Sequence, residues 1–98
     1  MRKFKIKTIH DNTELVVDAL TFDELIENGL KNGANVENGM PWSWKYKGFP
    51  ISHENDMCYL ITAMAIKMTP TDLLISDDNG YINVQPRELF EKCNKKIG

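Results

Sequence analysis

Residues 38–61 contain the side chains of this chain whose types and spacing could support binding or catalysis. Both tryptophans, Trp42 and Trp44, lie in this segment, and so does the polar run from His53 to Asp56. Indole rings offer flat apolar platforms, and imidazole, carboxamide and carboxylate groups form hydrogen bonds around them. The candidate ligand-binding residues are Trp42, Trp44, Lys45, Lys47, His53, Glu54, Asn55 and Asp56.

Aromatic and polar residues alternate along the first part of this segment, with Trp42, Trp44 and Tyr46 separated by Ser43, Lys45 and Lys47. In an extended strand, this alternation places the aromatic rings on one face and the lysines on the other. If exposed, the rings would stack on a nucleobase or anchor a protein partner. If buried, they would fill the space between a sheet and a helix. The pattern is compatible with both arrangements.

Common catalytic patterns do not fit the polar run. A zinc-protease helix needs a second histidine four residues from the first, and the run around His53 has a single histidine. Adjacent residues of a strand point to opposite faces, which prevents His53, Glu54 and Asp56 from converging on a metal ion. The spacing gives no reason for Cys58 or a serine to meet His53 or His10 as nucleophile and base. We therefore predict a protein that is not an enzyme, with no cofactor and no metal site. A small hydrolase that uses His53 and Glu54 for proton transfer is the enzymatic alternative.

Length and composition predict one folded domain, 1–98. A chain of 98 residues with 42% hydrophobic and 27% charged residues is typical of a globular protein with a modest core. The formal charge of -2 argues against a general nucleic-acid binder. The sequence has short apolar runs and a basic, alternating start, which predicts no membrane partner and a cytoplasmic location. We expect Cys58 and Cys93 to be reduced and to pack as small hydrophobes.

The first third of the chain predicts a hairpin followed by a helix. Residues 3–9 alternate as in a half-buried strand with Phe4, Ile6 and Ile9 inward, and 13–19 form a second strand after a turn at 10–12. Thr21 and Glu24 form a capping box at the start of an amphipathic helix over 22–31. Asn32-Gly33 provides its stop.

The remaining elements predict an α+β fold, a small antiparallel β-sheet domain with one main amphipathic helix and a short C-terminal helix. Residues 34–41 are expected to cross irregularly, because Pro41 cannot donate a ladder bond, with a turn at Asn38-Gly39. Extended segments are predicted at 42–46, 49–51, 58–61, 65–68, 73–75 and 81–84, with a polar turn at 53–56 and a hairpin turn at 77–80. The last helix, 87–93, is expected to bury Leu89, Phe90 and Cys93.

Several motifs between residues 38 and 92 resemble a family of small, uncharacterised bacteriophage and prophage proteins. The first is Met40-Pro41-Trp42-Ser43, and the second is His53-Glu54-Asn55-Asp56-Met57-Cys58-Tyr59-Leu60-Ile61. The third, Glu88-Leu89-Phe90-Glu91-Lys92, is similar to an Asp-Ile-Phe-Glu-Lys motif near the C-terminus of these proteins. The resemblance implies a viral origin.

The resemblance and the candidate residues together suggest a phage counter-defence factor in the host bacterial cytoplasm. Such a protein would sequester a host factor without chemistry, and the factor would be a nucleotide immune signal or a host protein. Stacking on Trp42 or Trp44, with contacts from lysine, His53 and Asn55, would hold it in a pocket shared between subunits of a homo-oligomer. The alternative is a phage accessory module that docks a protein through its aromatic patch, with no small ligand.

Overall fold

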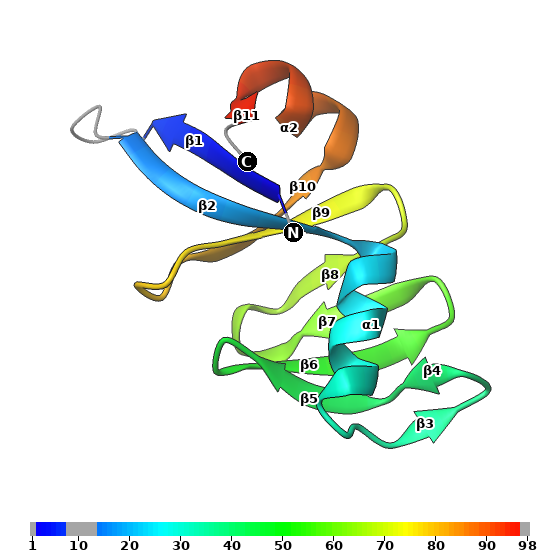
Figure 1. Cartoon of the computed structure of the whole chain (residues 1–98). Helices are drawn as coiled ribbons and strands as arrows, with labels where there is room; N and C mark the ends of the chain where they lie inside the picture. The colour runs from blue at the N-terminus through cyan, green and yellow to red at the C-terminus, as the bar shows by residue number, and fades with distance from the viewer. Residues whose placement is uncertain (1, 8–13, 97–98) are drawn as a thin grey trace.

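In residues 2–7 and 14–96, which the computed structural model describes, the chain forms two antiparallel sheets, a short ribbon and two α-helices (Figure 1). The first sheet has the strand order β10-β9-β2-β1-β11, and the second has the order β5-β6-β7-β8. Strands of the first sheet are β1 (Arg2–Lys7), β2 (Glu14–Thr21), β9 (Asp72–Ser76), β10 (Ile82–Pro86) and β11 (Lys95–Lys96). Strands of the second sheet are β5 (Ser43–Tyr46), β6 (Phe49–Asn55), β7 (Cys58–Ile61) and β8 (Ile66–Met68). The ribbon and the helices are β3 (Val36–Glu37), β4 (Met40–Pro41), α1 (Phe22–Lys31), α2 (Arg87–Cys93) and a 3-10 turn over Thr62–Met64.

The predicted N-terminal hairpin is confirmed in its two strands. Strands β1 and β2 pair antiparallel with Phe4 opposite Val17 and Ile6 opposite Leu15. Strand β2 then pairs on its other side with β9, from a distant part of the chain, with Leu20 opposite Leu74. The turn predicted at 10–12 and the inward position predicted for Ile9 lie outside the described residues.

Helix α1 has the predicted bounds because its start is defined locally. The Glu24 amide donates to the Thr21 hydroxyl oxygen at 3.2 Å, and the Thr21 amide donates to the Glu24 carboxylate at 2.9 Å. This capping box satisfies amides that the first helical turn leaves without intrahelical partners. Phe22, Leu25 and Gly29 form the buried side of the helix.

The first sheet lies between α2 and the second sheet, and α1 packs against β2 and β9 of the first sheet, β5 of the second sheet and β4 of the ribbon (Figure 1). Because strand residues alternate between faces, β2 and β9 supply two separate cores. Facing α2, the first core consists of Phe4, Val17, Ala19, Leu73, Ile75 and Phe90. Between the two sheets and α1, the second core consists of Leu20, Phe22, Leu25, Trp44, Tyr46, Ile51, Tyr59, Ile61, Met68, Leu74 and Ile82.

The prediction of one small sheet is wrong, because the strands divide between two sheets and a ribbon. Strands β5 to β8 form the expected meander, but β9 pairs with β2 instead of following β8 into the same sheet. Residues 34–41 are also more regular than predicted, since Pro41 of β4 lies opposite Val36 of β3. A proline is tolerated there because a two-residue ribbon has outer edges that need no ladder bond.

Helix α2 has the predicted bounds but buries fewer of its residues than predicted. Phe90 is buried and contacts Phe4 edge to face, with ring centroids 4.8 Å apart. In contrast to the prediction, Leu89 and Cys93 are exposed. Phe90 is the buried residue of this seven-residue helix, and it packs into the core between α2 and the first sheet. Among the described residues, neither helix combines the length and apolar character needed to cross a bilayer.

Candidate functional site

The aromatic row is divided between the core and the surface. Trp44 and Tyr46 of β5 are 8% and 4% exposed, whereas Trp42, which directly precedes β5, is 42% exposed. The Trp44 indole N–H donates to the Asn28 side-chain oxygen of α1 at 3.0 Å. Of the two arrangements considered for this row, Trp44 and Tyr46 therefore adopt the buried one and Trp42 the exposed one.

Trp42 rests on the imidazole ring of His53 in β6. The two ring centroids are 4.3 Å apart and the ring planes differ by 20°, which is a stacked arrangement. The strands fix this contact, because the His53 amide donates to the Trp42 carbonyl at 2.8 Å. As a result, the side chain of His53 is 5% exposed, although it lies at the end of the sheet.

Tyr59 of β7 and Asp56 complete this cluster, which we call the aromatic corner: Trp42, His53, Asp56 and Tyr59. The Tyr59 ring meets His53 edge to face at 5.5 Å, and its hydroxyl donates to the Pro41 carbonyl at 2.9 Å. Burial raises the pKa of Tyr59 to about 12, so the hydroxyl stays a donor at neutral pH. This bond ties the ribbon to the second sheet.

The imidazole of His53 is held more by its neighbouring rings than by hydrogen bonds. Its Nε2 lies 3.2 Å from the Asp56 carboxylate, whose side chain is 77% exposed. Its Nδ1 is buried and has no hydrogen-bond partner.

The other residues of the polar run belong to the hairpin between β6 and β7. Contrary to the predicted turn over 53–56, His53 to Asn55 belong to β6, and the strand register shifts between His53 and Asn55. The Asn55 side-chain oxygen accepts from the Met57 amide at 2.8 Å and shapes the turn. Glu54 is paired with Lys67 at 3.2 Å. Of the four residues, His53 and Asp56 are thus the pair that the structure brings together at the aromatic corner.

The two candidate lysines are separated from the aromatic corner and from each other. Lys45 is exposed on β5, on the face opposite Trp44. Lys47 is outside β5, with a left-handed φ of +50° in a turn with Gly48, so the predicted face shared by both lysines is wrong. Its ammonium lies 2.6 Å from Asp18 and 3.3 Å from Asp78.

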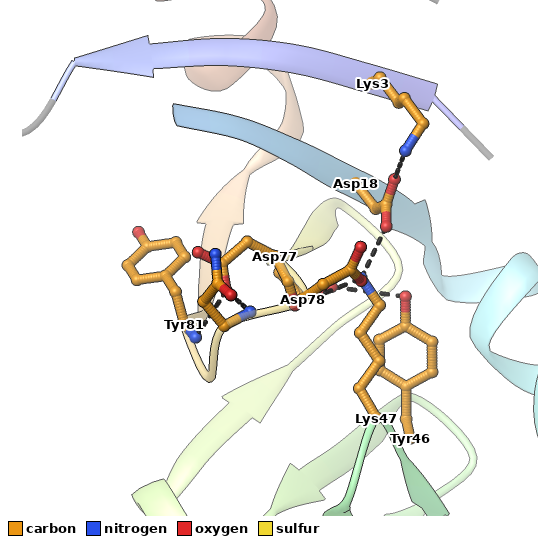
Figure 2. A network of polar contacts seen from close by, with 9 residues as sticks. Lys3, Asp18, Tyr46, Lys47, Asp77, Asp78 and Tyr81 are labelled. Carbon is orange, nitrogen blue, oxygen red and sulfur yellow. Dashed lines mark hydrogen bonds and ion pairs between the residues drawn. The ribbon is translucent and has the colours of Figure 1, made fainter. Parts of the chain in front are cut away.

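Asp18 is the centre of an ion network that joins the two sheets (Figure 2). It is bound by Lys47 and by Lys3, whose ammonium is 2.8 Å away. Burial acts to raise the pKa of Asp18, but the hydrogen bonds from Lys3 and Lys47 outweigh burial and hold the pKa below its ordinary value. For Lys47, burial acts to lower the pKa, and Asp18 with its other partners raises it above the ordinary value. We call Lys3, Asp18, Lys47 and Asp78 the inter-sheet network.

Three concavities that the described residues form lie away from the aromatic corner. The first, about 250 Å³, lies beside α2 and is lined by Ile6, Tyr81, Gln85, Leu89, Phe90, Cys93 and Asn94. The others are lined by residues 20–31 along α1, and by residues of the β8–β9 turn and α2. None of these three linings includes Trp42 or His53. Within the described residues, no group of His, Cys, Asp and Glu is arranged to hold a metal ion.

No family model matches the chain, and no curated protein and no solved structure shows significant similarity to it. Its function therefore has to be inferred from the residues and their contacts.

Sequence reasoning missed the contribution of residues outside 38–61. Asp18 interrupts the apolar run of β2, and a carboxylate at such a position was a signal for a buried ion pair. Lys47-Gly48 between two alternating segments was a signal for a tight hairpin turn, which would have removed Lys47 from the strand. The role of Tyr59 had no local signal, because its hydroxyl partner is the carbonyl of Pro41, far away in the sequence.

Proposed function

We propose that this protein is a small binding protein that sequesters a host factor without altering it, and that the exposed part of the aromatic corner, Trp42 and Asp56, is its contact surface. The observation that carries this proposal is the half-exposed indole of Trp42 stacked on the buried ring of His53. A large aromatic ring that is already held in place loses little conformational entropy when a partner binds. Such rings are frequent energetic centres of interfaces.

The contacts of the corner favour binding over chemistry. The hydrolase alternative needs His53 and Glu54 to act on the same substrate. Glu54 is instead paired with Lys67, and His53 is covered by Trp42. A covered imidazole cannot approach a substrate proton within hydrogen-bond distance unless Trp42 moves away.

The phage resemblance supports a viral setting, in which the sequestered factor is a nucleotide immune signal or a host protein in the bacterial cytoplasm. A nucleobase would stack on the outer face of Trp42. The alternative, an accessory module that docks a protein, is favoured by Met57, which is 63% exposed in the turn next to Asp56. Flexible methionines are common at surfaces that adapt to protein partners.

Retention of a factor by the purified protein tests this proposal. The wild-type protein, Trp42→Ala and the control Leu89→Ala would be expressed in a bacterial host and purified, and each would be heated to release bound molecules for mass spectrometry. Leu89 is an exposed apolar residue on α2, on the other side of the first sheet. We expect wild type and Leu89→Ala to retain the same intact nucleotide or host protein, and Trp42→Ala to lose it.

Thermal-shift measurements with linear and cyclic nucleotides complement the retention assay, since a ligand that binds the folded state raises the melting temperature. Release of a chemically altered product would indicate an enzyme instead. Equal retention by Trp42→Ala and wild type would remove the aromatic corner as the contact surface.

A further inference from the structure

The charge at the aromatic corner indicates which kind of chemical group the corner can bind. Asp56 lies at the edge of the Trp42–His53 stack, with one carboxylate oxygen 3.2 Å from His53 Nε2 and most of its side chain exposed. The corner therefore presents an exposed negative charge beside the His53 ring on which Trp42 stacks.

The lysines of the second sheet and its turns have acidic partners of their own or lie on another face of the sheet. Lys47 is held by Asp18 and Asp78, and Lys67 is held by Glu54. Lys45 lies on the opposite face of β5. The phosphates of a nucleotide stacked on Trp42 would thus face the Asp56 carboxylate without compensation from these cations.

We propose that the aromatic corner binds a cationic side chain, arginine or lysine, of a protein partner. This inference rests on the proposed function and selects the protein form of the host factor. One face of the Trp42 indole is occupied by His53, so the exposed area of the ring includes the other face. A cation over that face is attracted by the ring quadrupole, which is strongest for tryptophan. The exposed Asp56 carboxylate, paired with the stacked His53 ring, adds the matching charge.

The shape of an arginine side chain suits the exposed indole of Trp42. A guanidinium group carries five N–H donors in a plane, and arginine stacks readily on aromatic rings.

Nuclear magnetic resonance titration of the whole chain tests the inference with three probes. They are Nα-acetyl-arginine amide, its neutral isostere Nα-acetyl-citrulline amide, and adenosine monophosphate. We expect the arginine probe to shift the Trp42 indole N–H resonance in a saturable way with a dissociation constant in the millimolar range, as for a single weak contact. The citrulline probe should bind at least about threefold more weakly, because it lacks the charge. Trp42→Phe identifies the Trp42 resonance, and the unshifted Trp44 indole resonance reports the intact core.

Two variants separate the charge at the corner from charge elsewhere. Asp56→Asn should weaken arginine binding about twofold to fivefold, because an exposed ion pair makes a contribution of that order. The matched control Asp78→Asn, in the inter-sheet network, should leave the affinity for the arginine probe unchanged.

Equal shifts with arginine and citrulline would overturn the inference, and so would a response to adenosine monophosphate alone. In the latter case the proposed function would stand in its nucleotide form. The absence of any response also overturns the inference, and the retention assay with Trp42→Ala then decides the proposed function separately.

Discussion

Trp42 and Trp44 lie two positions apart on the same side of the chain, yet their surroundings differ. Helix α1 covers Trp44 through Asn28 and Gly29, whereas Trp42 stacks on His53 and is 42% exposed. The same residue type therefore contributes to the core at one position and to an accessible surface at the other.

This difference leads to a prediction at the residue scale. Trp44→Ala should lower the free energy of unfolding by about 3–5 kcal/mol, because it leaves a cavity in the core. Trp42→Ala should lower it by about 1–2 kcal/mol, because the ring is already partly exposed. Urea unfolding followed by circular dichroism measures both values. Equal losses would show that Trp42 is a core residue like Trp44.

The close packing of helix α1 depends on a glycine, Gly29. A Cβ atom at Gly29 would lie 2.7 Å from the Pro41 Cβ and 2.9 Å from a Trp44 ring carbon. The absence of a side chain lets the ribbon and β5 approach the helix, and this approach positions Pro41, whose carbonyl binds Tyr59. From the sequence, Gly29 only weakens the last helical turn; its packing role depends on the partner elements.

Substitution of Gly29 tests the close approach at the element scale. Gly29→Ala improves helix propensity by up to about 1 kcal/mol, but the clash with Pro41 and Trp44 should outweigh this gain and give a net loss of about 1–2 kcal/mol. The control Leu30→Ala changes an exposed neighbour and should cost less than about 0.5 kcal/mol. Chemical unfolding of both variants provides the comparison. A stabilised Gly29→Ala variant would contradict the packing described above.

At the scale of the whole molecule, the inter-sheet network links the second sheet to the first. Lys47 extends from the turn between β5 and β6, and its ammonium contacts Asp18 of β2 and the Asp77 carbonyl after β9. Tyr46 lies beside these contacts (Figure 2), and its hydroxyl is 3.4 Å from that of Ser76. The two sheets are therefore joined by polar contacts at one end and by the shared core.

Acid should weaken this junction. The pKa of Asp18 in the folded protein is below its ordinary value of 3.8, so the unfolded chain takes up the proton first as the pH falls. The stabilising contribution of Asp18 is fully present above that ordinary value and disappears as the pH falls through the lower, folded pKa. Asp18→Asn should thus reduce the free energy of unfolding by about 1–3 kcal/mol at neutral pH and make the acid dependence shallower. Urea unfolding between about pH 7 and pH 2 follows both effects. An unchanged acid dependence would mean that Asp18 does not drive it.

The sequence by itself determined the elements whose signals are local. The capping box defined the start of α1, alternation predicted β1 and β5, and short apolar runs between turn residues predicted β2 and the rest of the meander. These patterns depend on neighbouring residues. The same local information placed the candidate site in the segment that contains Trp42, His53 and Asp56.

Tertiary structure decided which strands share a sheet and which candidate residues meet. The pairing of β9 with β2, the burial of Trp44 under α1 and the capture of Lys47 by Asp18 all join segments that are distant in the sequence. Each depends on which faces pack together in the folded chain, and alternation alone gives a residue its face but not the neighbour across from it.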